Sequence, residues 1–158
     1  MTPPSYEHYV YAGFWVRVLA SIIDTVLVML VTSPILYWVD GPASMHQSMT
    51  GGFSGGGDFL ITFVLPMIAV ILFWMYRQAT PGKMAFGARV VDARTGGALS
   101  FGQSLGRYLG YFVSIIPFGL GLLWVAFDGR KQGWHDKLAG TVVIRPRGGG
   151  QTVKFEAQ

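Results

Sequence analysis

The sequence predicts an all-α membrane protein with two transmembrane helices, a third hydrophobic segment that is broken, and a small cytoplasmic β element. Apolar residues make up 51% of the chain and charged residues 13%, whereas soluble domains typically hold about 25% charged residues. The apolar residues gather in long runs, which indicates segments that cross a bilayer. Basic residues cluster beside these runs, and one run contains proline and glycine. We therefore expect a single membrane domain over residues 1–158.

Composition argues against several classes of protein. The chain has no cysteine, which excludes a disulfide framework, a thiolate metal site and a cysteine nucleophile. The net charge of +4 does not indicate nucleic-acid binding, because the basic residues lie where the positive-inside rule and anionic lipids favour them. No nucleic-acid-binding motif accompanies them. A cleaved signal peptide is not expected, because the first basic residue is Arg17 and the apolar run is longer than a signal core.

The first transmembrane helix is predicted over residues 14–38, after a short tail at residues 1–10. The run exceeds the about 20 apolar residues that a bilayer core requires. Tyr37 and Trp38 suit the far interface, where aromatic rings are enriched. Pro34 lies in the last turns, where proline is able to kink a helix.

A Gly-rich loop at 39–58 precedes a second transmembrane helix at 59–76, and a basic segment at 77–107 follows. The loop contains no Lys or Arg between positions 40 and 57. The basic residues of the following segment are Arg77, Lys83, Arg89, Arg94 and Arg107. The positive-inside rule places this segment in the cytoplasm, the loop outside, and the N-terminus in the cytoplasm.

Two stretches of the chain resemble each other and predict a small sheet. The first, "GARVVDA" at 87–93, begins a longer stretch that looks like a strand, a Gly-Gly turn and a short return strand. The second, "GTVVIRP" at 140–146, is also strand-like. We expect the two to pair on one side of the membrane.

The third apolar run covers residues 108–127 and is interrupted by "SIIPFGLG", a pattern that breaks or bends helices. A basic tail follows at 128–158. A full crossing by the third run would put this tail outside, against the positive-inside rule. We favour a broken, re-entrant or interfacial segment with a cytoplasmic C-terminus, covered by protein where its backbone is irregular. A plain third span with an external tail is the alternative.

Two charges lie in the first helix. Arg17 and Asp24 are two turns apart on one face, about 10 Å along the axis, which is too far for a within-helix ion pair. Ser21 lies between them and Thr25 flanks them. This polar stripe is expected to face protein rather than lipid.

Asp24 has a short side chain and lies deeper than Arg17, which is able to snorkel to the interface. A lone carboxylate at that depth is costly, so it must find a donor, find a cation or become protonated. One interpretation is a structural network that clamps the first helix. The other is a proton or cation site, because intramembrane ionisable groups often mark pathways.

The stretch "GWHDKLAGT" at 133–141 places His135 beside Asp136. Adjacency alone does not give a catalytic dyad its geometry, and no nucleophile motif is present, so we do not expect an enzyme. Asp136 also suits a helix N-cap, with a short helix ended by Gly140. In a third interpretation Asp136 reaches Arg17 at the cytoplasmic face.

Cofactor and metal sites are not expected. "QATPGKM" at 78–84 lacks P-loop spacing and indicates a tight turn with Lys83 at the lipid head groups, or a weak anion or lipid site. Met45, His46 and Met49 are possible copper ligands, but a Gly-rich loop holds them poorly. No other grouping of His, Asp or Glu has metal-ligand spacing.

The chain resembles the RDD family of small membrane proteins, named for one arginine and two aspartates. The resemblance covers residues 11–146 and rests on three stretches in this order: "AGFWVRVLASIID", "TPGKMAFGARVVDARTGG" and "LGRYLGYFVSIIPFGLGLLWVAFDGRKQGWHDKLAGTVVI". In that family the arginine opens the first helix and the first aspartate lies in its middle, which matches Arg17 and Asp24. The second aspartate corresponds to Asp136, with Asp128 as the less favoured match.

The resemblance implies a bacterial inner-membrane protein, and it suggests transport of ions or small ligands, because some members have been linked to sodium–proton exchange. Two spans in one copy can hardly enclose a pathway, so transport implies a homo-oligomer or other membrane subunits within the lipid bilayer. A non-catalytic accessory subunit of a larger complex is the alternative. In either case the expected functional charge network is formed by Arg17, Asp24 and Asp136. The secondary candidates are Lys83, Arg107, Asp128 and His135.

Overall fold

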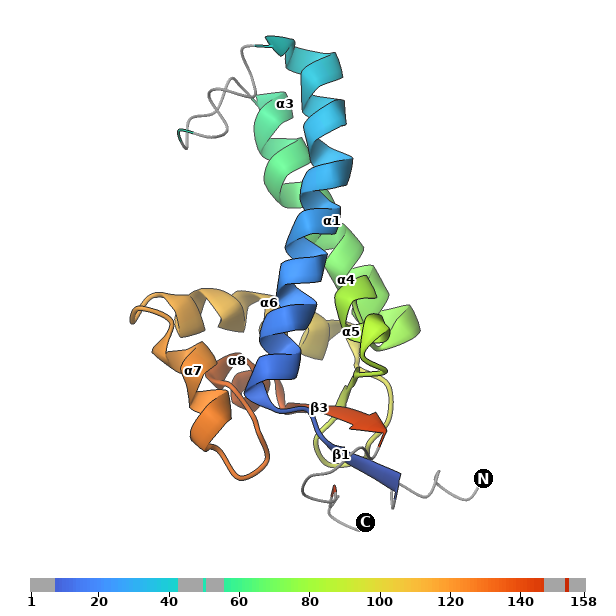
Figure 1. The fold of residues 1–158 in the computed structure, drawn as a ribbon, viewed down its shortest axis with the longest axis vertical. Helices are drawn as coiled ribbons and strands as arrows, with labels where there is room; N and C mark the ends of the chain where they lie inside the picture. The colour runs from blue at the N-terminus through green and yellow to red at the C-terminus, as the bar shows by residue number, and fades with distance from the viewer. Residues whose placement is uncertain (1–7, 43–49, 51–55, 147–152, 154–158) are drawn as a thin grey trace.

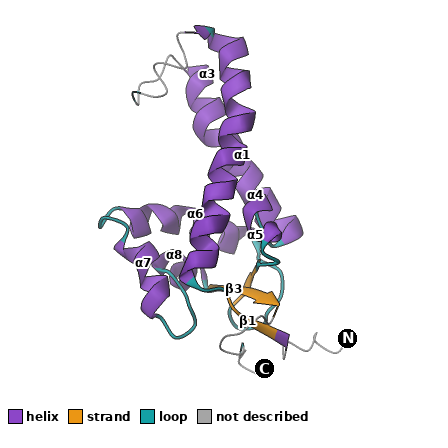
Figure 2. Cartoon of the chain, in the orientation of Figure 1, coloured by secondary structure: helices purple, strands orange, loops and turns teal. Residues whose placement is uncertain are grey.

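The structure is a computed structural model that describes residues 8–42, 50, 56–146 and 153. Two long helices lie side by side and rise from a group of shorter helices and a small sheet, which we call the base (Figure 1). Figure 2 shows that the strands are confined to this base. Two helices of the described chain are long and apolar enough to cross a membrane, which confirms the predicted fold class.

Helix α1 covers Phe14–Asp40 and forms the first span. It begins after the extended residue Gly13 and ends at Gly41, whose φ of 74° favours glycine. Pro34 lies inside the helix and does not end it. The helix therefore runs two residues into the predicted loop 39–58.

The second span is one helical segment from Gly56 to Arg77. It consists of α3 (Gly56–Phe59), one π-helical turn (Leu60–Val64) and α4 (Leu65–Arg77). The π-helical turn ends two residues before Pro66, which lacks the N–H needed to continue the α-helical ladder. The span starts three residues earlier than predicted, so both ends of the predicted loop are helical.

The third apolar run is broken, as predicted. Helix α6 (Phe101–Ile115) and helix α7 (Leu120–Phe127) are bent by 100° at a short break. Phe118 and Gly119 have positive φ there, and the turn is tight because a Cβ on Gly121 would lie 2.6 Å from Ser114 Cα. A plain straight span is therefore wrong.

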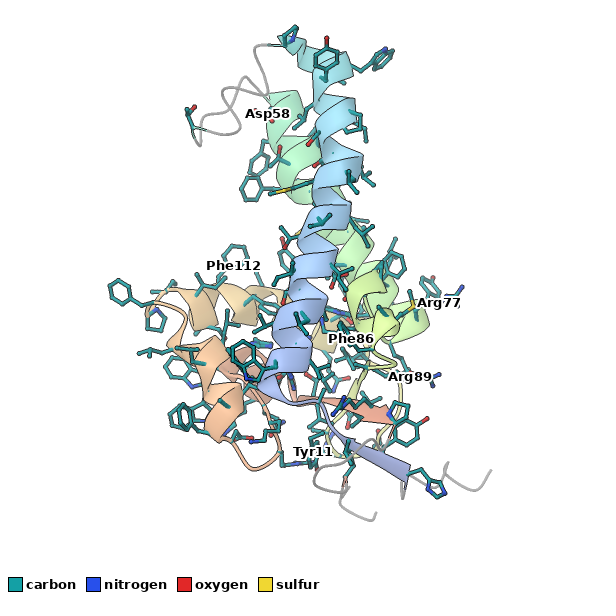
Figure 3. The ribbon with its side chains drawn as sticks, in the orientation of Figure 1. Tyr11, Asp58, Arg77, Phe86, Arg89 and Phe112 are labelled. Carbon is teal, nitrogen blue, oxygen red and sulfur yellow. The ribbon has the colours of Figure 1, made fainter. Side chains whose placement is uncertain are left out.

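Helix α6 lies across α1 in Figure 1, and Figure 3 shows Phe112 projecting from it toward the side on which the spans rise. The helix begins at Phe101 with a capping box formed by Ser100 and Gln103. The predicted boundary between the segments 77–107 and 108–127 consequently falls inside α6.

The sheet has the order β1-β3-β2 and is antiparallel throughout. Strand β2 (Arg89–Asp92) pairs with β3 (Thr141–Pro146), which confirms the predicted pairing. Strand β1 (Tyr9–Tyr11) was missed, because its first residues were assigned to the tail 1–10. The predicted return strand after the Gly-Gly turn is also wrong, since residues 97–100 form no strand.

The two faces of the sheet bury different partners. On one face Val91, Val142 and Ile144 pack with Tyr11 in a small core. On the other face Val90 and Val143 pack with Trp74 of α4. The second core therefore packs the sheet against the second span. Two short helices complete the base: α5 (Pro81–Ala85) and α8 (Trp134–Ala139).

Candidate functional site

Asp136 lies at the centre of the base and is completely buried. It is the third residue of α8, and its Oδ2 accepts a hydrogen bond from the backbone N–H of Gly133 at 3.0 Å. The N-cap is Gly133, so the prediction of Asp136 as N-cap is wrong by three positions. Gly140 ends the helix with a φ of 64°, as expected.

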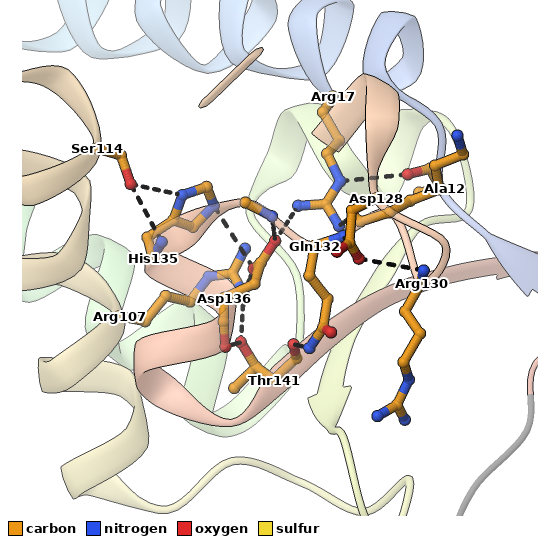
Figure 4. A network of polar contacts seen from close by, with 12 residues as sticks. Ala12, Arg17, Arg107, Ser114, Asp128, Arg130, Gln132, His135, Asp136 and Thr141 are labelled. Atoms are coloured by element: carbon orange, nitrogen blue, oxygen red, sulfur yellow. Dashed lines mark hydrogen bonds and ion pairs between the residues drawn. The ribbon is translucent and has the colours of Figure 1, made fainter. Parts of the chain in front are cut away.

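Two arginines from distant helices meet this carboxylate (Figure 4). Arg17 Nη1 of α1 donates to Asp136 Oδ2 at 2.5 Å, and Arg107 Nη1 of α6 forms an ion pair with Asp136 Oδ1. Arg17 also donates to the backbone oxygens of Ala12 and Lys131. We call Arg17, Arg107 and Asp136 the buried triad. The third interpretation of Asp136, a contact with Arg17, therefore holds.

Burial alone would raise the pKa of Asp136, but Arg107 and Arg17 outweigh it and hold that pKa well below its usual range. Arg107 is itself completely buried. It donates to Thr141 Oγ1 at 2.7 Å, and its guanidinium lies 5.1 Å from the ring centre of Trp74. The triad therefore links α1, α6 and α8 through ion pairs, which is the arrangement expected of a structural network.

His135 packs inside the base, and its Nε2 lies 3.5 Å from Asp136 Oδ1. Its ring stacks on Tyr111 at 4.1 Å between centroids, and its backbone N–H donates to Ser114 Oγ at 3.1 Å. A Cβ on Gly110 would lie 2.9 Å from His135 Cα, so the glycine lets α6 and α8 approach closely. Burial lowers the pKa of His135 to about 3, and the ring is therefore neutral near pH 7.

Acidification is expected to destabilise the protein through His135. Its folded-state pKa of about 3 lies below the ordinary value near 6.5, so the unfolded chain takes up a proton first as the pH falls. This contribution to stability is then complete above about pH 6.5 and falls by about 1.4 kcal/mol per pH unit between about pH 6.5 and pH 3. Thermal unfolding in detergent at several pH values measures this slope. His135→Gln should flatten the slope, and an unchanged slope in His135→Gln would contradict the assignment.

Asp24 has different partners from Asp136. Thr80 Oγ1 donates to Asp24 Oδ2 at 2.5 Å, and the backbone N–H of Gly82 donates to Asp24 Oδ1 at 2.7 Å. No ion pair joins Asp24 to Arg17 within the described residues. The predicted single network is therefore two separate groups, one around Asp136 and one around Asp24.

Lys83 belongs to the second group. Its side chain is buried in α5, with Nζ 3.5 Å from Thr80 Oγ1 and 6.0 Å from the ring centre of Trp74. The predicted position at the lipid head groups is therefore wrong. Burial lowers the pKa of Lys83.

A cavity of about 490 Å³ lies beside Asp24, among α1, α4, α5 and α6. Along α1 its lining runs from Ser21 to Thr32, a rise of about 16 Å. A smaller pocket of about 110 Å³ touches Arg17 and His135. The residues that line both spaces are Ser21, Lys83 and Tyr111. These three side chains therefore lie between the cavity and the pocket that adjoins the buried triad.

Asp128 has a local role. Its Oδ2 accepts from the backbone N–H groups of Arg130 and Gln132, and its Oδ1 pairs with Lys137 at 2.5 Å. The Lys137 side chain is half-exposed and that of Asp128 is mostly buried, so this carboxylate stabilises a turn near the surface of the base.

The order of these charged residues along the chain agrees with a known family. The model of the RDD family matches residues 11–140, which contain Arg17, Asp24 and Asp136. The chain belongs to the RDD family. No solved structure matches it.

Relatives from two bacterial species cover most of this chain. The Bacillus subtilis protein named "Uncharacterized protein YxaI" is 31% identical over 84% of this chain and 96% of its own length. "Uncharacterized membrane protein YteJ" of the same species is 30% identical over 87% and 82%. The "Proline-rich antigen" of Mycobacterium leprae is 28% identical over 83% and 60%.

Sequence reasoning about this RDD protein missed two partners of Asp24. Thr80 and Gly82 lie in the "TPG" stretch that follows the second span. A hydroxyl donor two residues before a glycine, which allows close backbone contact, could have indicated that this stretch packs against a polar residue of a helix. Met45, His46 and Met49 lie outside the described residues.

Proposed function

We propose that this RDD protein takes part in the transport of ions or small ligands through the cavity beside Asp24. The observation that carries the proposal is a carboxylate in the middle of a spanning helix that lines a cavity of about 490 Å³. Ionisable groups are costly at this depth and often mark transport pathways. Lys83 at the same cavity supplies a second titratable group.

The smaller pocket supports a continuation of this path toward the base. Ser21, Lys83 and Tyr111 separate the two spaces, and movement of these side chains would connect Asp24 with the pocket beside Arg17. The buried triad then acts as the fixed frame of the path. One chain contributes two spans and one bent pair of helices, so the complete path requires a homo-oligomer or further membrane subunits.

The proposed location is the bacterial inner membrane, with both termini in the cytoplasm. Arg77 and Arg89 lie at the end of the molecule that carries the sheet (Figure 3), and the positive-inside rule assigns a basic end to the cytoplasm. We propose no enzymatic role. Asp136 is committed to two arginines, and His135 is packed against Tyr111.

Ion flux in proteoliposomes tests the proposal. An imposed sodium or pH gradient should drive flux in the wild type, and Asp24→Asn should lower it at least about tenfold by removing the charge at the cavity. The amide oxygen still accepts the hydrogen bond of either Thr80 or Gly82, so the variant should remain folded. Asp128→Asn is the matched control and should retain flux. Wild-type flux in a folded Asp24→Asn protein would contradict the role of Asp24 in transport, and absence of flux in the wild type would contradict transport itself.

An accessory subunit is the second candidate, and the low burial of the spans favours it. Only 6% of the most apolar window of the first span and 11% of that of the second are buried by this chain. Such surfaces are available to lipid or to another membrane protein. Native mass spectrometry after gentle purification distinguishes the two. A different subunit at fixed stoichiometry, together with no flux, supports the accessory role.

A further inference from the structure

Lys83 is a buried cation with few acceptors. Its relative exposure is 8%, and its single hydrogen-bond contact within the described residues is Thr80 Oγ1, at the long distance of 3.5 Å. An ammonium group carries three donors. At least two of them are left without a protein acceptor, which is costly at a buried position.

The charges around Lys83 do not balance. The charged side chains near the cavity and the triad are Arg17, Asp24, Lys83, Arg107 and Asp136. They comprise three cations and two carboxylates. Asp136 is shared by both arginines, while Asp24 already accepts from Thr80 and Gly82. An added anion beside Lys83 would make the group neutral.

A second donor of the cavity wall also lacks a partner. Trp74 is 1% exposed and lines the cavity, and its Nε1 has no hydrogen-bond partner within the described residues. The Lys83 ammonium lies 6.0 Å from the centre of this ring. The two donors together indicate a ligand with an acceptor group at this end.

The rest of the cavity suits an apolar chain. Its wall includes Val28 and Val31 of α1, together with Leu65, Ala69 and Phe73 of the second span. These residues lie within the spanning segments, where a lipid-soluble ligand is able to enter from the bilayer. The volume of about 490 Å³ suits a drug-sized ligand and is too small to enclose both chains of a phospholipid.

We propose that the cavity binds a single-chain carboxylate amphiphile from the membrane, with its carboxylate at Lys83 and Trp74 and its acyl chain along α1 and α4. The bound carboxylate satisfies the spare donors and neutralises the charge excess. The apolar chain replaces lipid against the cavity wall. This inference goes beyond the proposed function, because occupancy of the cavity does not require passage through it.

Displacement of a fluorescent fatty acid tests the inference. The delipidated full chain in a non-ionic detergent is saturated with dansyl-labelled undecanoate, and palmitate is added as competitor. Palmitate should displace the probe at least about tenfold more strongly than its methyl ester or a hexadecyl trimethylammonium salt, because only the carboxylate pairs with an ammonium. Equal displacement by the methyl ester, or stronger displacement by the cation or by a two-chain phosphatidylglycerol, would overturn the proposal.

Two variants locate the binding to the cavity. Lys83→Gln should weaken palmitate binding about tenfold by replacing the charged donor with a neutral one. Ala69→Trp should abolish binding by filling the cavity, whereas Ile68→Trp at an exposed neighbouring position outside the lining should bind like the wild type. Unchanged binding in either folded Lys83→Gln or Ala69→Trp refutes the site. Binding without flux supports the inference and refutes transport, and flux without binding does the reverse.

Discussion

Asp136→Asn is expected to lower the free energy of unfolding by about 3–5 kcal/mol, because it leaves two buried arginines without a counter-charge. Arg107 is completely buried and Arg17 mostly so. An amide cannot replace a carboxylate that is shared by two guanidinium groups. The loss should appear as a lower thermal midpoint in detergent and as poor recovery from membranes.

Asp128→Asn is the matched control for this change. Asp128 pairs with the half-exposed Lys137 and accepts two backbone hydrogen bonds, which an asparagine side chain also accepts in part. The loss of an exposed ion pair costs about 0–1 kcal/mol. Equal stability of the Asp136→Asn and Asp128→Asn proteins would show that the buried triad does not hold the helices together.

Gly82→Ala is expected to separate α5 from the first span and to lower the free energy of unfolding by about 1–3 kcal/mol. A Cβ at this position would lie 2.1 Å from the backbone oxygen of Ala20 and 2.9 Å from Asp24 Cγ. The Ala20 oxygen is a backbone atom of α1, so the clash cannot be relieved without moving the backbone of α1 or α5. The shift would also remove the Gly82 N–H from Asp24. Thermal unfolding measures the loss, and flux should fall with it.

Gly106→Ala provides the control for the added methyl group. No atom lies within 4 Å of a Cβ built at Gly106, which is inside α6. Alanine in a helix interior is favoured over glycine by about 0.5–1 kcal/mol. The Gly106→Ala protein should therefore be as stable as the wild type or more so. A Gly82→Ala protein with the same stability as Gly106→Ala would refute the close packing of α5 on α1.

Sequence reasoning predicted the features that depend on local pattern. Hydropathy located both spans, and the Pro-Gly punctuation at 114–121 located the bend between α6 and α7. The similarity of 87–93 and 140–146 predicted the pairing of β2 with β3. Strand β1 was missed because three residues carry too little pattern to be separated from a tail.

The candidate site was predicted only in part, because its contacts depend on how distant segments pack. Arg17 and Asp136 were expected to meet, and they do. Asp24 was placed in the same group because a polar stripe on one helix face does not indicate which partner each residue meets. Thr80 and Gly82 come from a turn 56 and 58 residues away. The cavity forms only where α1, α4, α5 and α6 pack together, so no pattern along the sequence indicated it.

The separation of the two groups gives the polar residues different roles. The buried triad joins three helices, with Asp136 and Arg107 completely buried and Arg17 mostly so, and the packing of these helices explains its charges. Asp24 and Lys83 line a cavity that extends along both spans. The packing of the helices around this cavity does not require a lysine. Asp136 therefore serves stability, and we propose that the function lies in the cavity beside Asp24.

Cysteine accessibility tests this central claim most directly, because the natural chain has no cysteine and gives a clean background. Thr25 lines the cavity one residue beyond Asp24, whereas the neighbouring Val26 is exposed and lies outside the lining. Water-soluble methanethiosulfonate reacts with the thiolate, which forms where water reaches. In liposomes, Thr25→Cys should be modified and Val26→Cys should not. Modification of neither position, or of both at equal rates, would contradict a functional cavity beside Asp24.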